Sequence, residues 1–176
     1  MRKTKPVARN ESNRPVNSHK SQSRRVTFGF FLVIIAVVAS FIVISVFRPA
    51  LVNGVSMQKT LSDGQLIWLW QWKYVPQVGD IVVTNTKNTA REILIKRVIA
   101  TGGQRIVIRD SIVYINDQPL SEPYVYETEW LGLDLDLLVP EGFLFLMGDN
   151  RNNSIDSRTL GVFSNNEIMG KVLFIQ

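Results

Sequence analysis

Few side-chain types in this chain could carry out chemistry. The 176 residues include no cysteine and a single histidine, His19. Without cysteine there is no thiol nucleophile, no disulfide framework and no thiolate metal or iron–sulfur site. Because His19 lies in a polar N-terminal stretch, a Ser-His-Asp triad or a His-rich zinc site in the folded part is excluded. A nucleophilic enzyme built from this chain would need Ser or Thr activated by Lys.

Lys96 is the best candidate for a lysine base. It lies in the run Ile-Leu-Ile-Lys-Arg-Val-Ile at 93–99, which is typical of a strand. On a strand Leu94, Lys96 and Val98 would share one face, and an ammonium between apolar neighbours loses hydration. Desolvation lowers a lysine pKa from about 10.4 toward the range that a base needs at neutral pH. The alternative is a packed stem whose charged head reaches water.

Ser56 and a polar segment at 148–158 are the other candidates. Ser56 follows Asn53-Gly54-Val55, and the glycine suits a close backbone approach or an unusual φ angle. The second segment, Gly-Asp-Asn-Arg-Asn-Asn-Ser-Ile-Asp-Ser-Arg, follows an apolar run, so its Asx and Ser side chains could build a rigid turn. Taken alone, Ser56 could equally be a turn residue, and 148–158 a polar surface loop.

The elements that must position these residues begin with a helix. Residues 26–47 form a stretch of 22 residues without charge, long enough to cross a bilayer as a helix. Arg24 and Arg25 precede it and Arg48-Pro49 end it, with no A-x-A-like cleavage site after Phe47. We expect an uncleaved transmembrane anchor, with residues 48–176 outside the cytoplasm by the positive-inside rule.

Charge is concentrated before this anchor. Residues 1–25 hold eight Lys or Arg and one acid, whereas residues 26–176 hold twelve basic and fourteen acidic residues. The basic balance therefore belongs to the N-terminal stretch, which argues against a folded nucleic-acid-binding surface. With so few apolar residues, 1–25 is predicted to be a disordered cytoplasmic tail.

The part after the anchor reads as mostly strand. Short runs rich in Val, Ile and aromatic residues recur between turn residues, at 66–70, 80–84, 93–100, 105–108, 112–115, 143–147 and 171–175. Arg109-Asp110 between two runs suggests a hairpin, and no segment keeps a helical apolar period. We predict a mainly β domain over 48–176, closed or sandwich-like, with few helices.

Three tryptophans alternate within one of these runs. Trp68, Trp70 and Trp72 would share one face of a strand. That face is either core or a contact with the membrane interface, where tryptophan is enriched.

The order of these motifs resembles that of bacterial type I signal peptidases. The resemblance runs from the anchor to the C-terminus through Gly-Val-Ser-Met-Gln-Lys-Thr-Leu (54–61), Val-Gly-Asp-Ile-Val-Val (78–83), Ile-Lys-Arg-Val-Ile (95–99) and the segment 148–158. The last motif is highly specific. The resemblance implies a coiled-sheet β-barrel ectodomain and a Ser–Lys endopeptidase that removes signal peptides from exported preproteins at the outer membrane face.

The resemblance assigns the chemistry to two residues. Ser56 would be the nucleophile and Lys96 the general base, taking the hydroxyl proton and returning it to the leaving amine. Ser154 would orient the Lys96 amine, and Met57 would help to line the pocket for a small residue before the cleaved bond. Some members use a serine two residues before the nucleophile to bind the oxyanion. Here that residue is Gly54, so the oxyanion site would depend more on the Ser56 backbone N–H.

Four further residues match supporting positions of the family. Asp156 and Arg158 correspond to a structural ion pair of the polar loop, and Asp149 and Arg97 to positions that support the site. The pattern departs from the family at Lys59, where a proline is usual, which removes a φ restraint and adds a charge near the nucleophile. It departs again at Ala-Thr-Gly-Gly-Gln (100–104), where Gly-Leu-Pro-Gly-Asp is common.

Two rival functions share parts of this pattern. A Ser–Lys self-cleaving regulator would carry a DNA-binding module before the β domain, where this chain has a tail and an anchor. A non-enzymatic membrane-anchored homologue, acting in assembly or as a chaperone, would be expected to lose Ser56 or Lys96, and both are present. The implied partners are signal peptides and the lipid bilayer, with no nucleic acid, metal or organic cofactor. The oligomeric state is left open.

Overall fold

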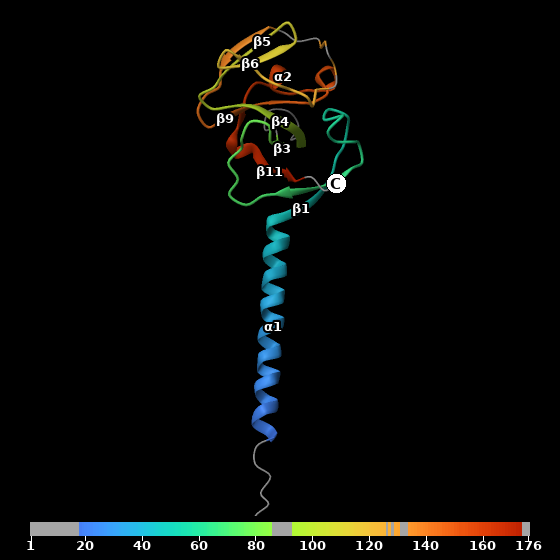
Figure 1. Ribbon diagram of the computed structural model, residues 1–176, viewed down its shortest axis with the longest axis vertical. Coiled ribbons are helices and arrows are strands. Elements are labelled where there is room, and N and C mark those ends of the chain that lie inside the picture. The colour runs from blue at the N-terminus through green and yellow to red at the C-terminus, as the bar shows by residue number, and fades with distance from the viewer. Residues whose placement is uncertain (1–17, 86–92, 126, 128, 131–133, 174–176) are drawn as a thin grey trace, which may run out of the picture. The chain divides into compact units, whose positions relative to one another are not determined.

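The computed structural model describes residues 18–85, 93–125, 127, 129–130 and 134–173. The chain divides into two units, one ending at Ile42 and one spanning Val43–Gln176. The described elements combine one long helix with many short strands (Figure 1). The predicted mainly β class with an N-terminal apolar helix is therefore confirmed.

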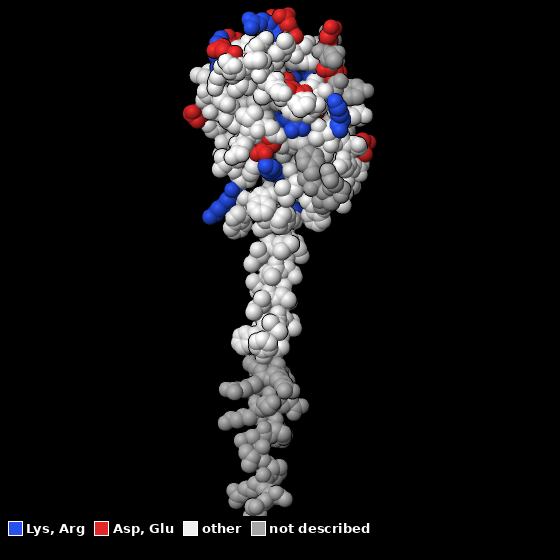
Figure 2. Space-filling view, in the orientation of Figure 1, with Lys and Arg blue, Asp and Glu red and all other residues white. Residues whose placement is uncertain are grey.

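The long helix α1 spans Ser18–Val46. Within it, Phe28–Val46 has a mean hydropathy of 2.9 and is long and apolar enough to cross a membrane. Figure 2 shows no basic or acidic side chain on the visible face of this segment. The helix starts earlier than predicted, because 18–25 is helical where we expected a disordered tail. Lys, Arg and Gln favour helix, so their backbone continues the apolar segment. The rest of the predicted tail, 1–17, lies outside the described residues.

A seven-stranded sheet forms the main body of the second unit. Its strand order is β1-β2-β11-β3-β4-β9-β10, and every neighbouring pair is antiparallel. The strands are β1 (Phe47–Leu51), β2 (Leu66–Trp70), β3 (Ile81–Asn85), β4 (Ile93–Thr101), β9 (Phe143–Met147), β10 (Phe163–Ser164) and β11 (Ile168–Leu173). In this order β1 and β10 stand at the two edges, so the described strands leave the sheet open.

A second sheet holds the predicted hairpin. Its order is β7-β6-β5-β8, formed by β5 (Arg105–Arg109), β6 (Ile112–Ile115), β7 (Gln118–Pro119) and β8 (Leu135–Leu138). Arg109 pairs with Ile112, and Asp110 and Ser111 between them both have positive φ angles, of 50° and 62°. Two successive positive φ angles match the twist of a tight two-residue hairpin.

Short helices complete the polar segment that follows β9. They are η1 (Arg151–Asn153), α2 (Ser157–Leu160) and η2 (Asn165–Glu167). Asp156 caps α2, because its side chain accepts a hydrogen bond from the Arg158 amide. The segment 148–158 is therefore ordered structure with several buried residues, whereas its composition alone would also fit a surface loop.

The tryptophan face points away from the core. Ile67 and Leu69 of β2 are buried in the apolar cluster beneath the sheet. Trp68 and Trp70 alternate with them and are only half-buried, and Trp72 is 57% exposed. Of the two interpretations left open for this face, core is therefore excluded, because the smaller aliphatic residues of the same strand fill it. The outward face also carries Leu66, which pairs with Leu51 of β1, and both are exposed.

Candidate active site

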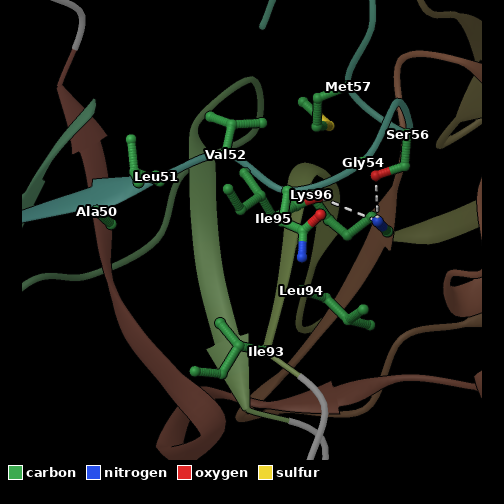
Figure 3. A pocket seen from close by; sticks show the side chains of 11 residues that line it. Ala50, Leu51, Val52, Gly54, Ser56, Met57, Ile93, Leu94, Ile95 and Lys96 are labelled. Atoms are coloured by element: carbon green, nitrogen blue, oxygen red, sulfur yellow. Dashed lines mark hydrogen bonds between the residues drawn. The ribbon is translucent and has the colours of Figure 1, made fainter. Parts of the chain in front are cut away.

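A cleft of about 510 Å³ opens between the segment 50–57 and the start of β4 (Figure 3). It is lined by Ala50, Leu51, Val52, Asn53, Gly54, Ser56, Met57, Ile93, Leu94, Ile95 and Lys96. Apolar side chains make most of the wall, and Met57 is 2% exposed. The predicted placement of Ser56, Met57 and Lys96 around one pocket matches this geometry.

Ser56 and Lys96 meet at the end of this cleft. The Lys96 Nζ lies 2.7 Å from the Ser56 Oγ, although forty residues separate them in the chain. A second hydrogen bond, of 3.1 Å, joins the Lys96 Nζ to the Ile95 carbonyl oxygen (Figure 3). At 2.7 Å the proton can lie on either partner, so a neutral amine at this position can accept the Ser56 hydroxyl proton.

The surroundings of Lys96 lower its pKa. Lys96 is 2% exposed, lies opposite the fully buried Val82 of β3, and shares its face with Leu94 and Val98. Burial is the main cause that lowers the pKa of Lys96 from 10.5 to about 8. Among the nearby charges, Asp156 and Asp149 raise this pKa and Arg158 lowers it. The charged head does not reach water, so a substantial fraction of the amine is neutral near pH 8.

Among the described strands, none pairs with the cleft side of the first half of β4. β4 pairs with β3 over Ile93–Arg97 but with β9 only from Arg97 onward. Val98 exchanges hydrogen bonds with Gly79 and Asp80, on the β3 side. Because backbone groups alternate between neighbours in an antiparallel sheet, Ile93 and Ile95 direct theirs to the cleft. An extended peptide could pair with this edge.

The loop 53–61, which carries the predicted nucleophile Ser56 and is called the nucleophile loop below, follows a path that proline could not. Lys59 is exposed and has a φ angle of 83°, whereas the proline ring holds φ near −65°. The loop is closed by hydrogen bonds from the amides of Thr60 and Leu61 to the Met57 carbonyl oxygen. Replacing the family's usual proline by Lys59 therefore does not only remove a restraint on φ. The loop also takes a backbone conformation that proline cannot adopt.

Asp149 and Arg97, which we predicted to support the site, lie in contact with each other. The Arg97 Nε and Nη2 donate to the two Asp149 carboxylate oxygens at 2.8 and 2.7 Å, and both residues are buried. The Thr60 hydroxyl donates to the same carboxylate, and the Arg97 Nη1 donates to the Gly79 carbonyl oxygen. This network joins β4, the nucleophile loop and the polar loop.

Asp156 and Arg158 form the second predicted pair. The Arg158 Nε and Nη2 each donate to an Asp156 carboxylate oxygen at 2.9 Å. Asp156 also accepts a hydrogen bond from the Gly148 amide at 3.0 Å. A side chain at Gly148 would have no room, because a Cβ there would lie 2.3 Å from the Ser154 Oγ and 2.5 Å from the Ser56 carbonyl oxygen.

Ser154 does not make the hydrogen bond to Lys96 that we predicted. Its Oγ is buried and has no hydrogen-bond partner among the described residues. The Lys96 Nζ is instead directed to the Ser56 Oγ and the Ile95 carbonyl oxygen. The Ser154 hydroxyl is thus a buried donor held against Gly148, on the loop that faces the nucleophile.

Sequence reasoning missed a layer that holds the polar loop. The fully buried Arg151 side chain donates to Glu122 and to the Gly148 carbonyl oxygen, and its guanidinium lies over the Trp130 ring. Tyr124 lies over the Arg97 guanidinium at 3.9 Å. Arg151 belongs to the motif we had singled out, but Glu122, Tyr124 and Trp130 carried no sequence signal that marks them.

Comparisons with known proteins identify the family of this chain. A family profile described as signal peptidase, peptidase S26, matches residues 25–176. Signal peptidase I T of Bacillus subtilis is 34% identical over 177 residues, covering 93% of this chain and 91% of that protein. Probable signal peptidase I-1 of Synechocystis is 36% identical and covers 81% of this chain and 78% of its own length.

A solved structure is also similar. The crystal structure of a signal peptidase I from Enterococcus faecalis matches with a TM-score of 0.50 and 32% identity, covering 56% of this chain and 97% of that one. Profile, relatives and structure all point to the same family. The chain therefore belongs to the signal peptidase I family of S26 serine peptidases, which cleave signal peptides from exported proteins.

Proposed function

We propose that Ser56 is the nucleophile and Lys96 the general base of a membrane-anchored signal peptidase. The observation that carries this assignment is the 2.7 Å contact between the Lys96 Nζ and the Ser56 Oγ, made by a lysine whose burial lowers its pKa to about 8. A base with such a pKa is neutral often enough at physiological pH to accept a hydroxyl proton.

The reaction follows from this pair. The neutral Lys96 amine takes the hydroxyl proton as the Ser56 Oγ attacks the scissile carbonyl carbon, and the Ser56 backbone N–H donates to the developing oxyanion. Collapse of the tetrahedral intermediate expels the amine of the mature protein, which receives the proton from Lys96. Water then hydrolyses the ester on Ser56, with Lys96 again acting as base.

The cleft is suited to an extended segment that ends in small residues. A signal peptide lying along Ile93 and Ile95 would add a strand to the free edge of β4. Val52 and Met57, both buried and lining the cleft, leave an apolar pocket that favours a side chain as small as alanine before the cleaved bond. Substrate selection would thus combine backbone pairing with exclusion of bulk.

The remaining predicted residues act by support. We assign to Arg97 and Asp149 the connection between β4 and the nucleophile loop, and to Asp156 and Arg158 the shape of the polar loop. We assign to the buried Ser154 hydroxyl the role of a partner for the Lys96 amine once the Ser56 Oγ has become an ester. That exchange would keep the amine oriented during deacylation.

Membrane attachment completes the proposal. We infer that residues 1–25 are cytoplasmic, 26–47 form the anchor, and 48–176 form an extracytoplasmic catalytic domain, because basic residues precede the span. The chain enters β1 directly after the apolar helix ends at Val46. The outward tryptophans of β2 and its neighbouring loop are therefore candidates for contact with the lipid headgroups.

The test is cleavage by the full chain in detergent or liposomes. The substrate is a preprotein whose signal ends in Ala-x-Ala, and the variants are Ser56→Ala and Lys96→Ala. We expect each to lose activity by at least about 10³-fold. The matched control is Ser62→Ala, which removes a hydroxyl from an exposed serine directly after the nucleophile loop and should leave the rate unchanged.

Two results would reject the assignment. Retained cleavage by Ser56→Ala or Lys96→Ala would place the chemistry elsewhere. A wild-type chain that leaves the preprotein intact, while another signal peptidase processes it, would favour the non-enzymatic alternative of an assembly or chaperone module.

A further inference from the structure

Asn150 contacts the nucleophile loop twice. Its backbone amide donates to the Ser56 carbonyl oxygen at 3.0 Å, and its side-chain Nδ2 donates to the Val55 carbonyl oxygen at 3.1 Å. These two carbonyl groups belong to the successive peptide units on either side of the Ser56 Cα. One buried residue, 6% exposed, therefore holds both peptide planes that flank the nucleophile.

The orientation of the Asn150 amide is itself fixed. Its Oδ1 accepts a hydrogen bond from the Asn153 amide at 3.2 Å and so caps η1. With the oxygen occupied by the cap, the nitrogen must face Val55. Capping alone could be done by Asp or Ser, but only an amide supplies both the acceptor for the cap and a donor to Val55.

The contact between the Asn150 Nδ2 and the Val55 carbonyl oxygen also orients the Ser56 N–H, which belongs to the same peptide unit. A trans peptide is planar, so its C=O and N–H point in opposite directions. Holding the Val55 carbonyl oxygen through the Asn150 Nδ2 and the Gln58 amide therefore sets the direction of the Ser56 N–H. Within the described residues the Ser56 N–H has no acceptor, so it is free to bind substrate.

The neighbouring residue cannot share this task. Gly54 has no side-chain hydroxyl, and its own amide donates to the Asp63 carboxylate at 2.8 Å. The stabilisation of an oxyanion thus depends strongly on how well the single Ser56 N–H is aimed.

We propose that Asn150 is a positioning residue for the oxyanion site, whose side-chain amide fixes the Val55–Ser56 peptide so that the Ser56 N–H faces the substrate oxyanion. The inference rests on the proposed function, in which Ser56 is the nucleophile. In this role Asn150 would stabilise the transition state, and it would affect neither substrate binding nor proton transfer to Lys96.

The test compares Asn150→Ser and Asn150→Asp with Asn153→Asp in the full chain. Ser and Asp keep an oxygen for the cap and lose the donor to Val55. Asn153→Asp makes the same chemical change three residues away, at an exposed side chain of the same turn. We expect kcat to fall by about 10- to 100-fold in both Asn150 variants, somewhat less than deletion of an oxyanion donor costs. KM should stay near wild type in both variants, as should all properties of Asn153→Asp. The acid limb of the pH profile should stay near wild type in Asn150→Ser, whereas the new buried carboxylate of Asn150→Asp should shift it to higher pH.

A pair of inhibitors separates this role from a purely structural one. A peptide aldehyde forms a bond between its carbonyl carbon and the Ser56 Oγ, while the hydroxyl proton passes to Lys96 and the carbonyl oxygen becomes the oxyanion. The corresponding peptide alcohol binds the same cleft without forming that bond. We expect Asn150→Ser to weaken the aldehyde by about 10- to 100-fold and to leave the alcohol unchanged.

Three outcomes would overturn the proposal. The first is a kcat for Asn150→Ser within twofold of Asn153→Asp. The second is equal weakening of aldehyde and alcohol, which would mean a damaged cleft. The third is a drop in unfolding midpoint of both Asn150 variants large enough to explain the lost activity, which would make Asn150 a folding residue. Ser56→Ala, measured in parallel, tests the proposed function separately, since its cleavage activity does not depend on what Asn150 does.

Discussion

Replacing Lys96 by methionine should stabilise the protein at neutral pH while removing its activity. The folded state lowers the Lys96 pKa from 10.5 to about 8 through burial. The folded protein therefore binds this proton less tightly than the unfolded chain does. Below the pKa of the folded state the buried ammonium lowers the free energy of unfolding by its full penalty. This penalty decreases as pH rises above the folded-state pKa and disappears once pH exceeds the pKa of the unfolded chain.

The size of the effect follows from the shift. A shift from 10.5 to about 8 corresponds to roughly 3 kcal/mol at pH 7. Methionine has a similar length and carries no charge, but it loses the hydrogen bonds to the Ser56 Oγ and the Ile95 carbonyl oxygen, worth about 1 kcal/mol each. We expect Lys96→Met to be more stable than wild type at pH 7 by about 1–2 kcal/mol.

The pH dependence is the sharper measurement. Between pH 7 and pH 9.5 the advantage of Lys96→Met should shrink by about 2 kcal/mol, because wild type gains stability as its lysine loses the penalty. Thermal unfolding in detergent, followed by tryptophan fluorescence, should show this as a change of roughly 4–8 °C in the difference between the two midpoints. Other titrating groups cancel in that difference. A difference that stays constant over this range would refute the reasoning.

Three further changes test other parts of the site. The kcat/KM of wild type should fall about tenfold for each pH unit below the Lys96 pKa of about 8, because only the neutral amine acts as base; a profile flat down to pH 6 would contradict this. Gly148→Ala should abolish cleavage and lower the unfolding midpoint, because its Cβ would lie 2.3 Å from the Ser154 Oγ and 2.5 Å from the Ser56 carbonyl oxygen. Gly142→Ala meets no atom within 4 Å but carries the backbone strain of a φ angle of 81°, so a larger loss in Gly148→Ala than in Gly142→Ala is due to the clash. Lys59→Pro should lower the free energy of unfolding by more than about 1 kcal/mol and reduce the cleavage rate, because proline cannot adopt a φ angle of 83°. Lys59→Gly, which can adopt that angle, should be tolerated. A Lys59→Pro variant more active than wild type would show that the loop adopts another path.

The sequence predicted most strands, and the residues it singled out for chemistry, Ser56 and Lys96, lie within hydrogen-bond distance of each other. Apolar runs between turn signals marked β2, β4, β5, β6 and β9 almost to the residue, because each strand buries apolar side chains between exposed turns. β1 escaped prediction, because Arg48 and Pro49 interrupt its apolar pattern and read as the end of the anchor. The sequence left the tryptophan face open between core and membrane interface, since large aromatic side chains occur in both places.

The parts of the site that were missed act through the backbone or through distant contacts. Asn150 contacts two carbonyl groups ninety-odd residues away, and such contacts leave no trace in composition or spacing. Tyr124 and Glu122 lie on a segment without regular structure, and their value depends on Arg97 and Arg151 being brought to them by the fold. At Lys59 the sequence showed the departure from the family's proline, but it could not show that this residue has a positive φ angle.

The arrangement of charge around Lys96 explains why burial can set its pKa. Two buried carboxylates lie near the amine, and unpaired carboxylates there would hold the lysine in its charged form. Each is instead bonded to its own guanidinium, Asp149 to Arg97 and Asp156 to Arg158. The raising influence of Asp156 is opposed by the lowering influence of Arg158, and desolvation remains the largest contribution to the pKa of Lys96. The ion pairs thus give the polar loop its shape, while burial outweighs the raising influence of the two carboxylates on the pKa of Lys96.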